Sequence, residues 1–428
     1  MRTVLVNLVY VIGGEAAVRA ANFAAALFIA REYGAATLGA YAVSLALVTV
    51  VVMFVDNGLQ TAAITQLSSD GTNRNNIIGR LTLSKTILLS GAAVILTVAA
   101  GWIKPGHFFL AIGVWVTVRA ILQSYSQLQM AVLKSVSKTN WIGIIQSVHG
   151  GFLFAGIYLS FRQGWSIVVL LGWLTLCQLL ELLLSMAVLY RGGIWPTWHG
   201  RLGFLAIMRI AAPFGIAYGL ANLIVRSDTI VLSRFVPLAE LGAFSAANSI
   251  LLIVYVSAWL FGSVLLPEMV RLSGTPESLR LYTNQWARWL ALVTVPCALL
   301  VSLVAPRLIV ALYGAAFAGS GVLGSVMALA CPFIILNSVY TTFTIAANTR
   351  MTFVGIYGAC ALATVGLDLC LGRAFGSMGI ASAIAIREAG MLAAFRLLTH
   401  RVRSSDVKIQ PRLLRRRLGA TQKTREAS

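Results

Sequence analysis

Charged residues are scarce in this chain: they make up 11% of its 428 residues, and only 13 residues are acidic. Soluble domains carry about 25% charged residues, so the composition excludes an ordinary soluble fold. The sequence has no Gly-Lys dipeptide, which excludes a P-loop nucleotide site, and it has no GxSxG or HExxH motif. It therefore offers no arrangement of residues for nucleophilic or ATP-dependent catalysis, and we do not expect an enzyme.

Cysteine and histidine are also rare, with five and four residues. The cysteines occur singly in apolar segments without CxxC spacing, and the histidines are scattered along the chain. This distribution is typical of packing residues rather than of a disulfide framework or a ligand cluster. We expect no cofactor and no metal site.

Apolar residues, in contrast, make up 59% of the chain, and the mean hydropathy is +0.86. A helix needs about 20 apolar residues to cross a bilayer, and such runs follow one another from end to end. The pattern predicts an all-α integral membrane protein with about 12 transmembrane helices. The expected spans are 4–30, 37–60, 77–102, 107–130, 141–161, 166–190, 208–232, 241–266, 286–312, 320–346, 352–371 and 375–398.

One stretch of the first half recurs in the second half. The run Ala20 to Tyr41 aligns with Leu223 to Phe244 at an offset of 203 positions, and both runs contain an apolar helix, an arginine, a short turn and a Leu-Gly-Ala-aromatic sequence. A period near half the chain length indicates two copies of one folding unit. Six spans in each half give both copies the same polarity, which predicts two parallel six-helix bundles around a central cavity. The expected domains are 1–200, 201–398 and a basic tail at 399–428.

Lysine and arginine are distributed unevenly between the two sides of the membrane. Of the 33, 23 fall on the side of both termini, including Lys85 and ten residues from Arg396 onward, whereas 6 fall on the opposite side. Cytoplasmic loops are enriched in these residues, so we expect a multi-pass protein of the bacterial inner membrane with both termini in the cytoplasm. The net charge of +20 is thus a topology signal with contact to anionic lipids, and we expect no nucleic-acid partner.

The other four arginines lie inside predicted spans, where a charge is costly and indicates a partner or a wet cavity. Polar residues recur at helical spacing on three spans: Glu15, Arg19 and Asn22 on the first; Arg119, Gln123 and Gln127 on the fourth; and Tyr218, Asn222 and Arg226 on the seventh. Each set shares one helix face. We predict that Arg19, Arg119, Arg226, Asn222 and Gln123 bind substrate in one cationic cavity.

Internal pairing is the alternative for these arginines. Glu15 lies one turn from Arg19, and Asp228 lies close to Arg226, so both acids are candidates for ion coupling or for simple charge pairing. Arg119 has no acid within one helical turn. Because guanidinium groups form strong, often bidentate bonds to phosphate, an anionic head group is the expected cargo.

The chain resembles the multidrug/oligosaccharidyl-lipid/polysaccharide exporter superfamily, specifically the Wzx-type polysaccharide flippases. The resemblance rests on the run VRAANFAAALFIAREYGAATLGAY, on the Asp-Asn-Gly-Leu sequence at 56–59, and on RSDTIVLSRFVPLAELGAFSAANSI in the second half. It implies a two-lobed exporter that moves an undecaprenyl-diphosphate-linked oligosaccharide from the inner to the outer leaflet by alternating access. A cationic residue on the first span is shared by such flippases, and Arg19 matches it. The resemblance also implies lipid-linked oligosaccharide, membrane lipids and polysaccharide assembly proteins as partners.

Three other functions remain open at this stage. A cation or drug antiporter of the same fold would need acidic cavity walls. A membrane polymerase or ligase acting on the same lipid carrier would present a long extracytoplasmic loop, whereas every gap on that side is short. A membrane-embedded scaffold would carry no cargo at all.

Overall fold

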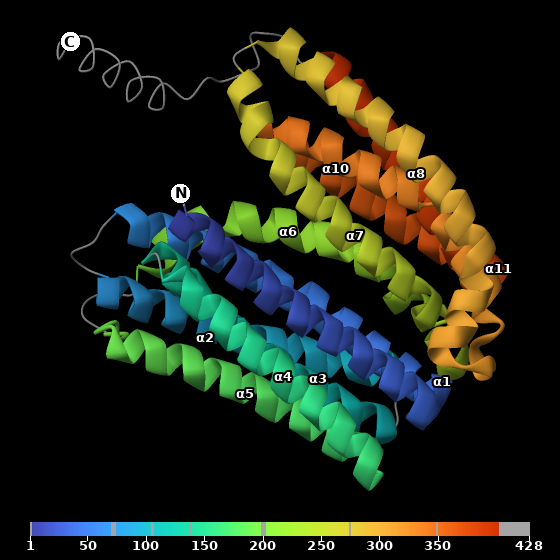
Figure 1. Cartoon of the computed structure of the whole chain (residues 1–428), viewed down its shortest axis with the longest axis horizontal. Helices are drawn as coiled ribbons and strands as arrows, with labels where there is room; N and C mark the ends of the chain where they lie inside the picture. The colour runs from blue at the N-terminus through green and yellow to red at the C-terminus, as the bar shows by residue number, and fades with distance from the viewer. Residues whose placement is uncertain are drawn as a thin grey trace. The chain divides into compact units, whose positions relative to one another are not determined.

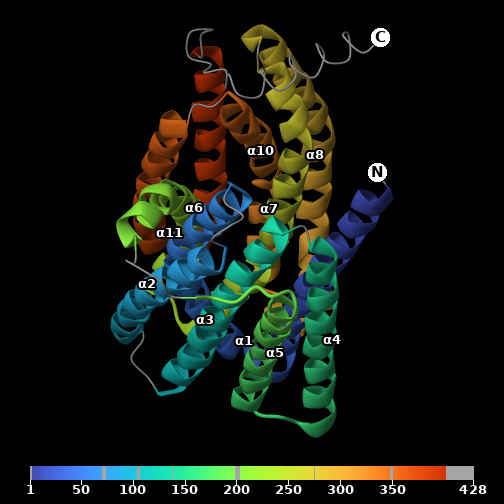
Figure 2. The same cartoon turned by 90° about the vertical axis from the view of Figure 1, so that its left-hand side faces the viewer.

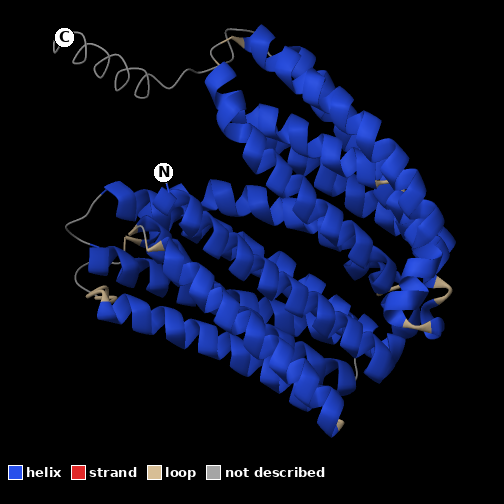
Figure 3. Ribbon diagram, viewed as in Figure 1, coloured by secondary structure: helices blue, strands red, loops and turns tan. Residues whose placement is uncertain are grey.

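The computed structural model describes residues 2–69, 74–103, 107–136, 138–197, 203–273, 275–347 and 350–401. Within these ranges the chain consists of helices joined by short turns, and it contains no strand (Figures 1 and 3). The all-α prediction is therefore confirmed. The expected basic tail lies outside the described residues except for its first three positions.

The helices follow the apolar runs of the sequence. In chain order they are α1 (Arg2–Ser69), α2 (Arg74–Ile103), α3 (His107–Ser135), α4 (Thr139–Gln163), α5 (Ile167–Arg191), α6 (Phe204–Leu232), α7 (Leu238–Leu272), α8 (Pro276–Tyr313), α9 (Ser320–Ala328), α10 (Cys331–Ala346) and α11 (Arg350–Arg401), with a short 3-10 turn at Ala315–Phe317.

Ten helices in the described part of the chain are long and apolar enough to cross a membrane. The two longest spans, Gly13–Ile64 and Gly355–Thr399, cover 52 and 45 residues, each more than twice the length that one crossing needs. Each contains one glycine with non-helical backbone and positive φ, namely Gly34 (φ 83°) and Gly376 (φ 58°). Glycine adopts this conformation without steric cost. Dividing both helices at these breaks gives about twelve crossings, as the sequence predicts.

The chain forms two compact units. Unit 1 comprises Met1–Asn248, Pro306–Gly324 and Ala361–Ala383, and unit 2 comprises Ser249–Ala305, Ser325–Cys360 and Ile384–Ser428. Unit 1 thus contains the whole of α1 to α6 and every residue predicted to bind substrate. The division into two six-helix bundles at residue 200, with a cavity between them, stays a prediction.

Within unit 1, α1 packs against α3, α4 and α6, and α5 packs against α3 and α4 (Figures 1 and 2). Glycines allow the backbones to approach closely. A Cβ atom at Gly14 of α1 would lie 2.6 Å from the carbonyl oxygen of Gly143 in α4, and one at Gly150 would lie 3.1 Å from Ala17. Small residues at such contacts are typical of membrane helices, whose association depends on van der Waals packing.

The two copies of the sequence repeat contact each other through equivalent atoms inside unit 1. A Cβ atom at Gly39 would collide with the carbonyl oxygen of Leu238, and one at Gly242 would collide with that of Ala35. Gly39 corresponds to Gly242, and Ala35 corresponds to Leu238, at the same offset of 203 positions. The Leu-Gly-Ala-aromatic sequence is therefore explained by a reciprocal helix contact that only glycine permits.

The arginine of the first repeat copy also has a structural role. Its Nε donates a hydrogen bond of 2.7 Å to the carbonyl oxygen of Leu312, and its Nη2 donates one of 2.5 Å to that of Ala311. These carbonyls belong to the last turn of α8, where no intrahelical donor is available. Arg31 therefore caps α8 within unit 1, which a positively charged group does favourably at a helix C-terminus.

Candidate functional site

The acidic and basic residues of the first span form an ion pair. Arg19 Nη2 lies 2.6 Å from Glu15 Oε1 across one turn of α1, and about half of the Arg19 side chain is exposed. Because an exposed pair at this spacing contributes little to stability, the contact leaves the guanidinium accessible. The structure thus shows the pairing alternative for Glu15, and substrate binding by Arg19 stays a prediction.

Arg119 joins two of the predicted polar faces. From α3, its Nη2 donates a hydrogen bond of 2.6 Å to Asn22 Oδ1, and its Nη1 approaches the hydroxyl of Tyr41 at 3.5 Å; both residues belong to α1. The Asn22 amide is held in turn by a 2.8 Å bond to the carbonyl oxygen of Val18. The stripe on α1 and the stripe on α3 therefore converge, as expected.

The hydrogen-bond partners of Arg119 are neutral. No carboxylate of the described residues lies within ion-pair distance of this guanidinium, and its Nε atom is buried without a hydrogen-bond partner. Gln123, one helical turn further along α3, is exposed and adds an amide to the same helix face. The guanidinium of Arg119 therefore has a hydrogen-bond donor and a positive charge that an anion can use.

Of the residues predicted on α6, Arg226 lies near the Arg119 site and Asn222 makes its hydrogen bond elsewhere. Arg226 lies within electrostatic reach of Tyr41, the same residue that Arg119 approaches, and of Asp228. Asp228 is buried and accepts a 2.7 Å hydrogen bond from the backbone amide of Thr229. The Asn222 amide, however, bonds to the carbonyl oxygen of Tyr218 on its own helix. Tyr41 is thus within reach of both Arg119 and Arg226, whereas no hydrogen bond of the described residues joins Asn222 or Gln123 to the arginines.

A buried ion pair between α1 and α2 was not predicted. Lys85 Nζ lies 2.8 Å from Asp56 Oδ1 and donates a 2.5 Å hydrogen bond to the carbonyl oxygen of Ser124 in α3, while the Ser124 hydroxyl bonds to the same carboxylate. Lys85 is completely buried inside the protein, and its place on the cytoplasmic side stays a prediction. A buried charge needs such a partner because its desolvation is costly.

A second buried pair lies between α4 and α5. His149 Nδ1 is 2.6 Å from Glu181 Oε2, to which Gln178 donates a 2.7 Å hydrogen bond. The sequence alone did not predict this pair, because the two residues lie on different helices. A histidine and a glutamate in the middle of two consecutive apolar runs are themselves the signal, since intramembrane ionisable residues pair with one another.

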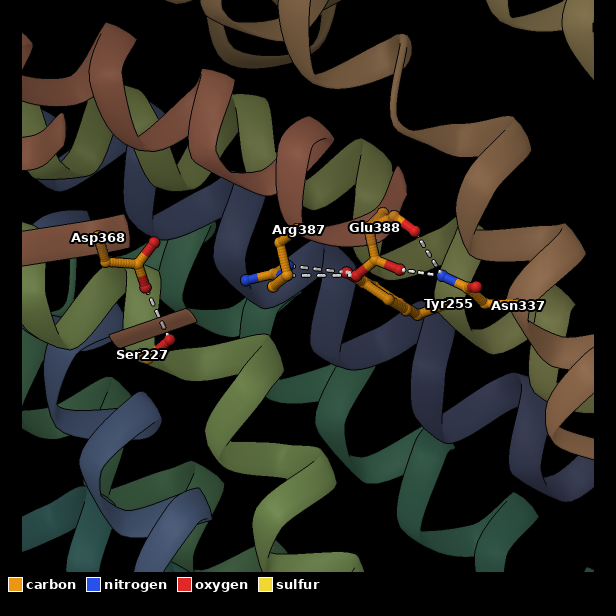
Figure 4. Close-up of polar contacts among 6 residues, drawn as sticks. All are labelled: Ser227, Tyr255, Asn337, Asp368, Arg387 and Glu388. Carbon is orange, nitrogen blue, oxygen red and sulfur yellow. Dashed lines mark hydrogen bonds and ion pairs between the residues drawn. The ribbon is translucent and has the colours of Figure 1, made fainter. Parts of the chain in front are cut away.

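Within unit 2, Glu388 is the centre of a polar network (Figure 4). Tyr255 donates a 2.6 Å hydrogen bond to its Oε1 atom, and Asn337 donates one of 2.8 Å to Oε2. Arg387 Nε lies 3.3 Å from Oε1, and its Nη2 donates a 3.0 Å bond to the Tyr255 hydroxyl. The intramembrane Arg387 is therefore satisfied by internal partners and does not call for a ligand.

Another intramembrane acid, Asp368, forms a hydrogen bond inside unit 1. The hydroxyl of Ser227 in α6 donates a 2.8 Å hydrogen bond to Asp368 Oδ2 in α11, and both side chains are buried (Figure 4). Among the described residues, no group of three or more His, Cys, Asp or Glu side chains is arranged to hold a metal ion.

Residues 4–273, more than half of the chain, match the family described as polysaccharide biosynthesis protein. The chain belongs to this family. No curated protein matches it.

Solved structures share the fold over nearly the whole chain. The lipid II flippase MurJ in an inward closed conformation superposes with a TM-score of 0.77 at 13% identity, covering 94% of this chain and 89% of that protein. A multidrug resistance MATE family transporter of the MOP superfamily, in an inward-facing conformation, gives 0.74 at 14% identity and covers 91% and 94%. A MOP superfamily transporter from Pyrococcus furiosus gives 0.65 at 12% identity and covers 94% and 95%.

The family match and the shared fold confirm the superfamily that the sequence resembles. This family member has the fold of membrane flippases and transporters, with about twelve membrane-spanning helices.

Proposed function

We propose that this protein is a flippase that moves an undecaprenyl-diphosphate-linked oligosaccharide from the inner to the outer leaflet of the bacterial inner membrane, by alternating access. The observation that carries the proposal is Arg119, a cation on a membrane-spanning helix whose partners in the structure, Asn22 and Tyr41, are neutral. A diphosphate is the type of ligand that such a guanidinium binds best, through charge-assisted and often bidentate hydrogen bonds.

Two further arginines support an anionic cargo. Arg226 is near the same tyrosine that Arg119 approaches, and Arg19 lies one turn before Asn22 on α1 with an accessible side chain. Asn22 and Tyr41 orient the cation, while Asn222 and Gln123 add amides for the sugar or phosphate oxygens. The lipid tail remains in the bilayer, so the protein has to shield only the polar head group during transfer.

The test uses a strain in which the gene is deleted. We expect lipid-linked oligosaccharide to accumulate in the cytoplasmic leaflet, and complementation with the wild-type gene to remove it. Arg119→Ala, present in the membrane at normal level, is expected to leave the accumulation in place. A deletion strain without accumulation would show that this protein does not move that substrate.

A cation or drug antiporter is the second candidate, because the MATE family transporter shares the fold. A cationic drug would be repelled by the arginines of unit 1. Transport of a labelled organic cation that survives both Arg19→Ala and Arg119→Ala would favour the antiporter over the flippase.

A further inference from the structure

The two copies of the sequence repeat differ in how they satisfy one cation. At the offset of 203 positions, Lys85 of α2 corresponds to Arg288 of α8, and Asp56 of α1 corresponds to Trp259 of α7. The same offset separates the ends of α1 and α7. In the first copy the lysine is buried and lies 2.8 Å from the aspartate. The second copy keeps the cation but has an indole in place of the carboxylate.

A second arginine lies near Arg288 in unit 2. Ala287 of α8 and Phe395 of α11 belong to one buried cluster with Tyr340 of α10. Arg288 and Arg396 directly follow these two cluster residues, and both guanidinium groups lie within electrostatic reach of the Tyr340 hydroxyl. Both arginines are exposed, and among the described residues neither has an ion-pair partner or a side-chain hydrogen bond. Two like charges in this position favour an anion between them.

A neutral donor lies at the same place. The Tyr340 hydroxyl donates a 3.5 Å hydrogen bond to Oδ1 of Asn284, which lies one turn before Arg288 on α8. In the described part of the chain, the amide nitrogen of Asn284 has no hydrogen-bond acceptor. Guanidinium and amide N–H groups are the donors that bind phosphate oxygens in proteins. The residues of α8 and α11 thus present the chemistry of a phosphate site.

The residues next to the arginines are typical of the membrane interface. Trp289, beside Arg288, is 60% exposed, and tryptophan is enriched where a bilayer meets water. Leu292, one turn after Arg288, and Leu397, next to Arg396, are 67% and 61% exposed. By the predicted topology, the start of α8 and the end of α11 face the cytoplasm. The arginines therefore lie at the level of the head groups of the cytoplasmic leaflet.

We propose that Arg288 and Arg396 bind the phosphate of an anionic phospholipid from the cytoplasmic leaflet, with Asn284 as a further donor. The acyl chains of this lipid lie along the exposed apolar side chains at Leu292 and Leu397. Basic pockets between membrane helices on the cytoplasmic side are suited to such head groups. A zwitterionic lipid would bring its own cation close to the two arginines, so the site prefers phosphatidylglycerol to phosphatidylcholine.

The bound phosphate supplies in the second copy the negative charge that Asp56 supplies in the first. An external anion can do this because Arg288 is exposed, whereas Lys85 is buried with its aspartate. The site belongs to unit 2 and is distinct from Arg119, which belongs to unit 1. The inference therefore does not depend on which substrate the protein moves.

Native mass spectrometry of the delipidated protein, titrated with phosphatidylglycerol or phosphatidylcholine, tests this site. We expect wild-type protein to bind one phosphatidylglycerol more tightly than any phosphatidylcholine. The double variant Arg288→Gln with Arg396→Gln should bind this lipid more than about tenfold more weakly, since it loses two charge-assisted contacts. The control Arg271→Gln removes an exposed arginine of the same unit that is paired with Glu268, and it should bind as wild type does.

Equal affinity of the wild-type protein and the double variant for phosphatidylglycerol would overturn the proposal, as would a wild-type protein without preference between the two lipids. Should the double variant fail to fold, Arg288→Gln alone is used, and an unchanged lipid preference would again overturn it. A third titration uses a polyprenyl diphosphate. Tighter binding of this molecule than of phosphatidylglycerol at the two arginines would assign the site to the lipid carrier and refute the phospholipid.

Discussion

Arg119 is the side chain on which the anion-binding proposal depends most. Its replacement by alanine removes a cation that reaches Asn22 and Tyr41 from α3. A charge-assisted hydrogen bond contributes roughly 1.5 to 3 kcal/mol, and about 1.4 kcal/mol corresponds to a tenfold change. We expect Arg119→Ala to lower the initial rate of flipping in proteoliposomes by more than about tenfold. Arg119→Lys should recover part of the rate, because it keeps the charge and loses the planar fork.

Arg162 provides the matched control for this measurement. It is an exposed arginine in the last turn of α4, within the same unit as Arg119. Arg162→Ala should flip substrate at the wild-type rate. A similar loss in both variants, or no loss in Arg119→Ala, would show that the rate does not depend on this specific cation.

The ion pair of α1 allows substrate binding and internal pairing to be separated. If Arg19 served only to neutralise Glu15, replacing both residues by glutamine would remove both charges and preserve function. We expect the double variant Glu15→Gln with Arg19→Gln to reach the membrane at normal level and to remain inactive, since the 2.6 Å contact between the two side chains leaves Arg19 half exposed. Recovery of flipping in this double variant would assign Arg19 a pairing role alone.

The reciprocal contact between α1 and α7 predicts a strong effect of one methyl group. A Cβ atom at Gly242 would collide with the backbone of Ala35, which cannot move aside as a flexible side chain can. We expect Gly242→Ala to lower the thermal unfolding temperature and the membrane yield. Gly151→Ala is the control, because a Cβ atom there meets nothing within 4 Å. Equal stability of the two variants would mean that the contact between the repeat copies adjusts without cost.

The helices were predictable from the sequence because a run of about 20 apolar residues corresponds to one crossing of the bilayer. The two copies of the Leu-Gly-Ala-aromatic sequence were also visible, yet their mutual contact was not, because periodicity places residues on one helix and leaves the neighbouring helix unspecified. The same limit explains the site. Helical spacing gave the faces of Asn22 and Arg119, but only the packing of α1 on α3 shows that these two side chains bond.

The buried ion pairs could not be predicted from the sequence. Lys85 is the twelfth residue of the 30-residue helix α2, and its pairing with Asp56 of α1 depends on how α1 and α2 pack, which the sequence does not specify. His149 and Glu181 are 32 positions apart on different helices, so no spacing rule within one helix relates them. Tyr41 was known only as a repeat position, whereas in the structure it lies near both Arg119 and Arg226.

The uneven distribution of lysine and arginine predicts the orientation of the whole chain in the membrane. We predict that the turn around Ala318 faces the periplasm and that Thr275 faces the cytoplasm; both residues are exposed. In a variant without native cysteines, Ala318→Cys should react with an impermeant thiol reagent added to intact cells, and Thr275→Cys should react only after the membrane is opened. Labelling of both positions in intact cells would contradict the twelve-span topology.

Flipping by the purified protein tests the central claim most directly. The protein is reconstituted into liposomes that contain an undecaprenyl-diphosphate-linked oligosaccharide in both leaflets, and a membrane-impermeant glycosidase reports the fraction that becomes accessible from outside. In protein-free liposomes only the outer leaflet is digested. We predict that wild-type protein makes nearly all of the oligosaccharide accessible and that Arg119→Ala does so more than about tenfold more slowly. Digestion that stops at the outer-leaflet fraction with wild-type protein, as in protein-free liposomes, would contradict the account.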